Sequence, residues 1–392
     1  MAFNIKPANT RVNYPYNGHL APNEVFGSIF NMILFQEVHY PNLAGQYNFV
    51  ETFKQAGNLY GDTALYYDQD ILESRNWLGD AEADDLLSTK RPEDPKCQAV
   101  VLDQFRIVKT TVDAYLSKRA WSTESAFTTF NDIVRSMVGQ TKRAYEIQMM
   151  NCYVGSVAGN AKKSLVEVPL SDITATGEEK NKLVAQTIAE TLANTIVDMK
   201  DYSRDYNDYE FYRSYTSDEL MVIWNSAYVN KIRKLSLPVI FNQAGLVDKF
   251  DEYVLPAKFF TEVVTAEKAQ AVSGLSVVGD EVVIGEGYSG APIVSYEEGH
   301  FVDSSKGNAM VHIMPGDILP KGATFKVGEA GFTDEDQICK IMTKDTIKYL
   351  SSFETATEFW NPQALLTNQM LIWGYSRPTR LLGQPCVTLH AD

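Results

Sequence analysis

The feature that most constrains this chain is a long run of helical periodicity in its first half. Between Ser122 and Cys152, apolar residues recur at three- and four-residue spacing: Phe127, Phe130, Val134, Met137 and Ala144. That spacing places them along one face of an α-helix. The sequence therefore predicts a long amphipathic helix over 122–152.

A second helix is predicted over 177–200. Thr176 and Glu179 have the spacing of a capping box, in which each side chain binds a free backbone N–H at the helix start. Apolar residues then follow at helical spacing: Leu183, Ile188, Leu192 and Ile196. A helix that runs to Lys200 is about 36 Å long, because each residue adds 1.5 Å.

The segment around residues 221–224 admits two interpretations. Thr216 and Glu219 repeat the capping-box spacing and favour a helix. Four consecutive apolar residues at 221–224 would encircle a helix, but they fit a strand that is buried on both faces. We favour the strand, followed by a short helix that Asn225 caps and that runs through Lys234.

Composition predicts the remaining segments. Residues 1–50 are rich in Asn, Pro and Tyr and are expected to form an extended arm with one anchor helix. Residues 51–105 hold a strongly acidic stretch in which Pro92 and Pro95 disfavour a helix. Short β-like runs punctuated by glycine predict a β-rich subdomain of hairpins over 261–332, and the C-terminal tail also predicts strands.

A tyrosine-rich stretch, residues 201–215, fits more than one interpretation. Its aromatic rings with polar tips suit a contact surface. They suit a β-edge, or a turn that packs on the core, equally well. These alternatives stay open at this point.

Charge and composition exclude several classes of protein. The 392 residues include 50 acidic and 35 basic ones, a net charge of −15, which excludes a generally basic nucleic-acid binder. Hydrophobic residues make up 45%, so disorder throughout is excluded. The apolar stretch 25–35 contains polar residues and follows no basic run, so it predicts neither a signal peptide nor a membrane span. The four cysteines, at 97, 152, 339 and 386, have no CxxC spacing and are predicted to be free thiols in a reducing cytoplasm.

Two glycine or lysine patterns resemble nucleotide-binding motifs but lack their context. Gly285, Gly287 and Gly290 satisfy GxGxxG, yet the residues that follow indicate a strand, so we predict a β-turn. The stretch 162–164 has no glycine directly before its lysines, as a phosphate-binding loop requires. No GxSxG elbow is present, because Ala291 stands where the second glycine is needed.

Titratable clusters give no stronger signal for a site. The five histidines are scattered, without a short metal-ligand spacing, and surface or structural roles are predicted for them: His19, His39, His300, His312 and His390. A second group is predicted to be a solvated acidic turn: Asp80, Glu82, Asp84 and Asp85. A third is predicted to complement the dipole at a helix C-terminus: Lys231, Arg233 and Lys234. We therefore expect no catalytic, cofactor-binding or metal-binding residues, and no cofactor.

The order of elements resembles a viral shell subunit. Residues 205–250 and 342–376 are similar to the major capsid proteins of short-tailed double-stranded DNA bacteriophages, which have the HK97 fold. These two stretches cover about a quarter of the chain, and the remainder is similar only in order and length. The resemblance implies an α+β fold with an N-terminal arm, an extended loop, a peripheral domain with a long spine helix, and an axial domain.

The resemblance also implies a division of the chain into domains. We expect an arm at 1–50, an extended loop at 51–105, a peripheral domain with both long helices at 106–215, an axial domain at 216–260, a β-rich insert or axial extension at 261–332, and strands returning to the peripheral domain at 333–392.

A capsid subunit is expected to be structural and not an enzyme. The resemblance implies pentamers and hexamers in an icosahedral head around double-stranded DNA, which is contacted non-specifically at most. Scaffolding, portal and decoration proteins are the expected partners, with no membrane, and assembly is expected in the host cytoplasm. Two alternatives stay open: the shell of a bacterial nanocompartment with the same fold, and a cytosolic enzyme or glycan-binding module with its site near residues 285–296.

Overall fold

The computed structural model describes residues 49–56, 62–72, 74, 91–113, 124–233, 251–289, 292–295, 319, 321–328, 330–363 and 366–392. The predicted arm and its anchor helix lie almost entirely outside these residues, and so do the acidic residues 80–85 and four of the five histidines.

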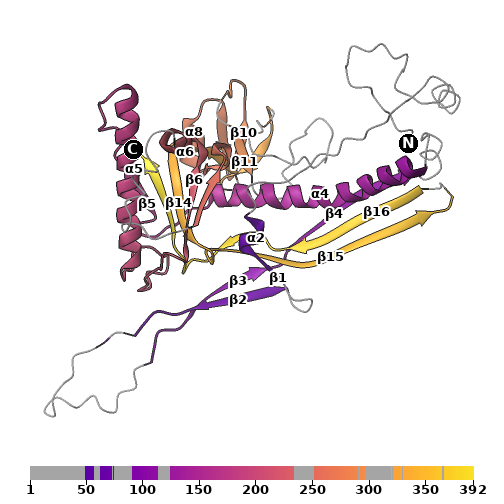
Figure 1. Ribbon diagram of the computed structural model, residues 1–392, viewed down its shortest axis with the longest axis horizontal. Helices are drawn as coiled ribbons and strands as arrows, with labels where there is room; N and C mark the ends of the chain where they lie inside the picture. Colours follow the sequence, from indigo (N-terminus) through magenta and orange to yellow (C-terminus); the bar gives the residue numbers. More distant parts are fainter. Residues whose placement is uncertain are drawn as a thin grey trace.

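A five-stranded sheet forms one half of the described structure (Figure 1). Its order is β5 (Leu165–Val168), β18 (Cys386–Ala391), β14 (Gln337–Thr343), β6 (Leu220–Asn225) and β7 (Asp251–Leu255). β14 pairs antiparallel with β6 and β18, whereas β5 and β7 pair parallel with β18 and β6.

Cores on both faces of this sheet explain why β6 is apolar at consecutive positions. Successive side chains of a strand point to opposite faces. Met221 and Ile223 enter a core shared with α4 (Glu124–Ser156), while Val222 and Trp224 enter a core shared with α5 (Gly177–Lys200). Every residue of β6 is buried, which confirms the prediction of a strand.

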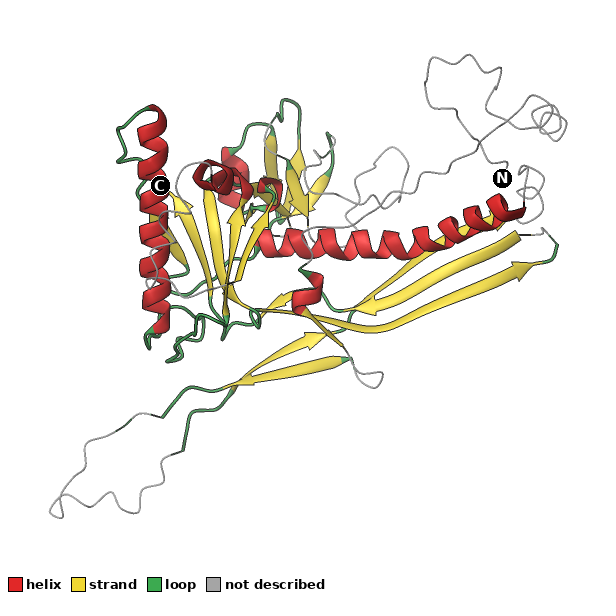
Figure 2. Cartoon of the chain, in the orientation of Figure 1, coloured by secondary structure: helices red, strands yellow, loops and turns green. Residues whose placement is uncertain are grey.

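A longer sheet runs along α4 in the other half (Figures 1 and 2). Its order is β1 (Lys54–Ala56), β15 (Ile347–Asn361), β16 (Leu366–Tyr375) and β4 (Gln104–Asp113), and β17 (Thr379–Arg380) also pairs with β15. The short helix α2 (Val50–Phe53) lies between this sheet and α4.

Aromatic side chains join α4 to the long sheet. Tyr145 of α4 contacts Trp373 and Tyr375 of β16, with 2.8 Å between the Tyr145 and Tyr375 hydroxyl oxygens. Trp373, Tyr375 and Tyr349 are almost wholly buried. These rings hold the middle of the helix to the long sheet, and its last turns, from Glu146 to Ser156, are buried on nearly every side.

The predicted β-rich character of 261–332 is confirmed within the described residues, although most of the strands pair with partners distant in the chain and not as successive hairpins. This part of the chain contains two three-stranded sheets: β12 (Thr324–Lys326), β10 (Glu281–Ile284) and β9 (Leu275–Val278), then β11 (Ile293–Ser295), β13 (Ala330–Thr333) and β8 (Thr261–Val263). A 3₁₀ turn, η2 (Ala257–Phe259), precedes it, and it also holds the helix α8 (Ala266–Ala271), which the sequence analysis did not predict. Its apolar residues form a core of their own.

The helix predictions hold, with local differences at the caps. The two long helices span 124–156 and 177–200, but the Thr176 side chain makes no capping hydrogen bond. Near β6, Glu219 Oε2 accepts a hydrogen bond from Thr216 N at 3.1 Å, as in a capping box. The chain there forms a turn that leads into β6. The short helix α6 (Ser226–Arg233) follows, and Asn225 Oδ1 accepts from Ala227 N at 3.0 Å, as predicted for a cap.

The packing differs from the predicted grouping in two places. The sequence prediction places both long helices in one unit at 106–215, but α5 packs on one face of the five-stranded sheet, whereas α4 packs on its other face and also runs along the long sheet. It also assigns the tail, 333–392, to one unit, whereas β14 and β18 join the five-stranded sheet and β15 and β16 form the long one. Sequence periodicity identifies a helix or strand but not the sheet that it joins.

Candidate assembly surface

A two-stranded ribbon projects from the body of the subunit (Figure 2). It consists of β2 (Thr63–Asp68) and β3 (Lys96–Val101), paired antiparallel, within the predicted extended loop 51–105. Residues 91–95 are neither helix nor strand and lead into β3, as the two prolines predict, while most of the acidic stretch before them lies outside the described residues. An isolated two-stranded ribbon is marginally stable in water, so contacts with other surfaces must hold it.

The outer face of the ribbon is apolar and exposed. Leu65, Tyr67 and Val101 are 53%, 67% and 48% exposed. The strand register places Leu65 opposite Ala99 and Tyr67 opposite Cys97, so these five residues share one face. We call them the outer ribbon face. The described residues leave this face exposed to water, which makes it a candidate surface for contact with another chain.

Ion pairs hold the base of the ribbon to the tyrosine-rich stretch 201–215. Asp68 pairs with Arg213, and Asp70 pairs with Arg204 while accepting a hydrogen bond from Tyr212 N at 2.9 Å. Burial raises the pKa of Asp70, but the hydrogen bonds from Tyr212 and Arg204 outweigh it and bring the pKa below its ordinary value. The carboxylate is therefore the form that holds the ribbon.

A second group of contacts ties β3 to the C-terminal part of the chain. Gln98 Nε2 donates to Arg380 O at 2.6 Å, and Gln98 Oε1 accepts from Leu382 N at 3.0 Å. The Arg380 guanidinium pairs with Asp208, with 3.0 Å from Nη1 to Oδ1. Because these two charged side chains are 8% and 10% exposed, this pair is screened little by solvent.

The tyrosine-rich stretch combines two of the interpretations left open. Tyr206 and Tyr215 are buried in the core below α5, as expected for a turn packed on the core. Tyr202 and Tyr212 are exposed and their rings stack with centroids 5.5 Å apart, beside the base of the ribbon. Its only β-pairing is one isolated bridge between Ser203 and Arg213, so it forms no edge strand among the described residues.

The long sheet also exposes apolar side chains. Phe105 and Ile107 of β4 lie on its outer surface, and Phe105 stacks on Phe353 with centroids 6.0 Å apart. Phe359 and Trp360 are exposed at the far end of β15. The long sheet therefore carries exposed apolar side chains in addition to those of the outer ribbon face.

The other patterns noted in the sequence lie at a turn, in a connection between elements and at the end of a helix. Gly285 and Gly287 precede a strand, β11, as predicted for a turn, and Gly290 lies outside the described residues. The stretch 162–164 joins α4 to β5, and Lys163 pairs there with Asp198 at 3.4 Å. Lys231 and Arg233 lie in the last turn of α6, and Lys234 lies beyond the described residues. All four cysteines are free thiols, of which Cys97 is exposed.

Two sheets, a long helix along one of them, and a projecting ribbon make up the HK97 fold. Solved structures support the fold. The capsid structure of Staphylococcus phage Andhra is similar with a TM-score of 0.54 at 12% identity, over 98% of this chain and 91% of that one. A chain in the structure of the head fiber and inner core protein gp22 of native bacteriophage P68 has the same TM-score and identity, over 100% of this chain and 93% of that one.

Sequence comparison then gives the family. Residues 17–373 match the family model described as the Phi29-like phage major capsid protein, and the chain belongs to that family. No protein of curated function matches it in sequence. The protein therefore forms capsids and is a component of the virion. Among the described residues, no helix has the length and apolar character needed to cross a membrane.

Proposed function

We propose that copies of this chain assemble as pentamers and hexamers into the icosahedral head of a short-tailed phage, around double-stranded DNA. The outer ribbon face carries this proposal, because it is a projecting apolar surface that its own subunit leaves uncovered. Shell subunits bury several modest surfaces against neighbours, so that assembly is reversible until the lattice closes. Its role is structural and not catalytic, assembly takes place in the host cytoplasm, and scaffolding, portal and decoration proteins are its partners.

We assign the domains of the shell subunit by packing. α4 and the long sheet would form the peripheral domain, with α4 as its spine, because α4 runs along that sheet and Tyr145 packs on Trp373 and Tyr375. The five-stranded sheet with α5 and α6 would form the axial domain, near the centre of each capsomer. This assignment moves 177–200 out of the peripheral domain that the sequence analysis predicts.

The outer ribbon face would lie on a neighbouring subunit of the same capsomer. The ion pairs at its base set the direction of the ribbon, while the apolar face supplies the contact. Full burial of one large apolar side chain contributes about 1.5–3 kcal/mol, and a closed shell repeats the contact at every subunit. A single charge on this face should therefore be enough to prevent closure.

Two variants of Tyr67 test the proposal. Tyr67→Asp places a charge on the outer ribbon face, and we expect folded subunits that do not form closed shells in negative-stain electron microscopy. Tyr67→Phe keeps the apolar ring and should assemble like the unmodified chain. Circular dichroism checks that both subunits are folded. Normal shells from a folded Tyr67→Asp subunit would contradict the proposed role of this face.

A further inference from the structure

The ribbon is joined by the chain to one sheet but is held by side chains that belong to the other. Its strands β2 and β3 continue into β1 and β4 of the long sheet. At the base of the ribbon, where β2 ends, the contacts are with residues 204–213, which precede β6, and with residues 380–383, which lead into β18. Figure 1 shows the ribbon running from β1 towards the five-stranded sheet.

Two carboxylates at the base of the ribbon meet two arginines of the loop 204–213. Asp68 pairs with Arg213 and Asp70 pairs with Arg204, and all four side chains are less than half exposed. We call these four residues the ribbon clamp. A guanidinium group is planar and binds a carboxylate in few orientations, so two such pairs restrict the direction of a strand more than they stabilise the fold.

The loop that carries both arginines is rigid. Asn207 is fully buried, and its side chain closes the loop with hydrogen bonds to the N–H and the carbonyl oxygen of Phe211, at 2.8 and 2.7 Å. Glu210 has a left-handed backbone with φ of 55°, which a non-glycine residue keeps only where surrounding contacts impose it. Arg204 Nη1 supplies one such contact, because it donates to Glu210 O at 2.7 Å. A rigid loop passes its own position on to the ribbon.

The loop is fixed in turn to the five-stranded sheet. Tyr206 and Tyr215 are buried in the core that this sheet shares with α5. Asp208 N donates a hydrogen bond to Leu382 O at 2.9 Å, and the Asp208 carboxylate pairs with the largely buried Arg380. The position of the loop is therefore set by the core of the five-stranded sheet and by the chain that enters β18.

The turn that leads into β18 also fits directly against the ribbon. A Cβ atom at Gly383 would overlap the carboxylate of Asp68, which cannot turn away without losing its ion pair with Arg213. The long sheet contributes a contact of another kind, a solvent-exposed hydrogen bond from Tyr66 OH to Gln55 Oε1 at 2.7 Å. Charged and closely packed contacts thus link the ribbon to the five-stranded sheet, and an exposed neutral contact links it to the long sheet.

We propose that the ribbon clamp fixes the ribbon to the five-stranded sheet, so that the ribbon turns with this sheet and not with the long sheet from which its strands emerge. The outer ribbon face is then already aimed in the free subunit, which avoids the ordering cost that a mobile arm has on binding. The clamp acts by positioning this face. Its part in assembly rests on the proposed function, whereas the direction of the ribbon in the free subunit does not.

Distances between spin labels on the full-length, unassembled subunit test this proposal. Cys97 lies on the ribbon and is exposed, the other three cysteines are buried, and Glu190→Cys supplies a second exposed site on α5. Pulsed electron paramagnetic resonance should give one narrow distribution of distances between the two labels. The double variant Arg204→Gln with Arg213→Gln should broaden this distribution. Gly383→Ala should shift its mean, because the added methyl group displaces the Asp68 carboxylate.

Two controls isolate the clamp. Lys163→Gln removes an ion pair between the α4–β5 connection and α5, and it should leave the distribution narrow. Labels at Glu190→Cys and Thr357→Cys, combined with Cys97→Ser, join the two sheets without the ribbon. Their distance should stay the same in the double arginine variant. Urea unfolding checks that each variant is folded.

The outcomes separate the clamp from the proposed function. A broader ribbon distance with an unchanged distance between the sheets supports the clamp, and equal ribbon widths with and without the two arginines would overturn it. The double arginine variant should also need a several-fold higher protein concentration to form shells, measured by light scattering. Assembly at the threshold of the unmodified protein would overturn the part of the clamp in assembly. Normal shells from a Tyr67→Asp subunit that keeps the narrow distribution would contradict the proposed function and still support the clamp.

Discussion

Two glycines of α4 give opposite predictions for the same substitution. A Cβ atom at Gly155 would lie 1.8 Å from the backbone oxygen of Phe259, where real Cβ atoms stay beyond 3.0 Å. Since the obstacle is backbone, α4 and η2 must move apart by about an ångström to relieve the overlap. A Cβ atom at Gly139 would meet nothing within 4 Å.

The magnitudes follow from two effects. Alanine favours a helix interior over glycine by about 1 kcal/mol, so Gly139→Ala should raise the free energy of unfolding by up to that amount. At Gly155 the same gain is outweighed by overpacking, which costs about 1–3 kcal/mol and more when backbone must move. We therefore expect Gly155→Ala to be less stable than the unmodified protein.

Urea unfolding of the unassembled subunit, followed by tryptophan fluorescence, measures both variants. Trp224 and Trp373 are buried in the cores on either side of the five-stranded sheet and report on loss of packing. The two midpoints should move in opposite directions. If the urea midpoint of Gly155→Ala equals or exceeds that of the unmodified protein, α4 and η2 do not approach each other as closely as described.

Two further predictions concern buried charges. Burial lowers the pKa of Lys340 from 10.5 to about 8, so its charged form is disfavoured in the folded state. The folded protein loses the Lys340 proton near pH 8, whereas the unfolded chain keeps it until near pH 10.5. Between these values the folded state alone is relieved of the buried charge. The free energy of unfolding therefore rises by about 2 kcal/mol between about pH 7 and about pH 9.5. Lys340→Met should lack this rise when urea unfolding is measured as a function of pH. If the variant and the unmodified protein show the same pH profile, the Lys340 ammonium is not buried in the folded state. Arg380→Met leaves Asp208 buried without its partner and should cost about 3–5 kcal/mol in the same assay, whereas Arg380→Met with Asp208→Leu should recover part of the loss. A double variant no more stable than Arg380→Met would refute this reasoning.

Local patterns predict much of the fold because they record local burial. The period of α5 follows from one buried face, which holds Ile188, Leu192 and Ile196, and the four apolar residues from Met221 follow from a strand between two cores. The predicted face of α4 fails at Met137, which is 50% exposed. Non-local pairing leaves no such pattern. Nothing near β5 indicates that it joins β18 at the end of the chain, and nothing in α5 shows that it covers the five-stranded sheet.

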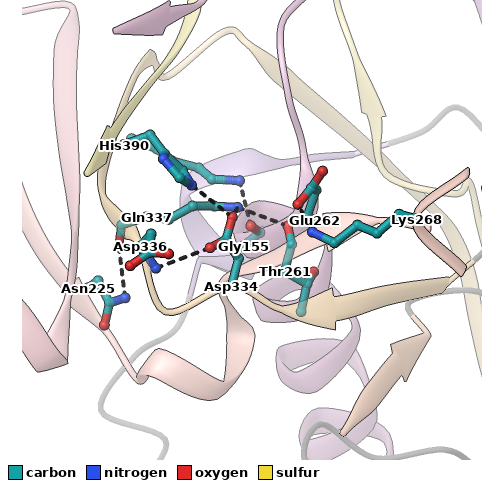
Figure 3. A network of polar contacts seen from close by, with 10 residues as sticks. Gly155, Asn225, Thr261, Glu262, Lys268, Asp334, Asp336, Gln337 and His390 are labelled. Carbon is teal, nitrogen blue, oxygen red and sulfur yellow. Dashed lines mark hydrogen bonds and ion pairs between the residues drawn. The ribbon is translucent and has the colours of Figure 1, made fainter. Parts of the chain in front are cut away.

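The candidate surfaces were harder to predict for the same reason. Leu65 and Tyr67 are exposed, but Ala64 and Tyr66 on the other face are also apolar or aromatic, so the sequence of this strand does not show which face the subunit leaves uncovered. His390 lies 56 residues from Asp334 in sequence, so no local spacing predicts that His390 Nε2 and Asp334 Oδ2 meet at 3.2 Å (Figure 3). The register of β18 on β14 brings the two side chains together.

Cryo-electron microscopy of assembled particles tests the central claim most directly. We expect closed icosahedral shells of five- and six-fold capsomers, with the outer ribbon face covered by a neighbouring copy of the chain. Shells in which Leu65 and Tyr67 contact only solvent, or a folded full-length protein that stays monomeric under every assembly condition, would contradict the account.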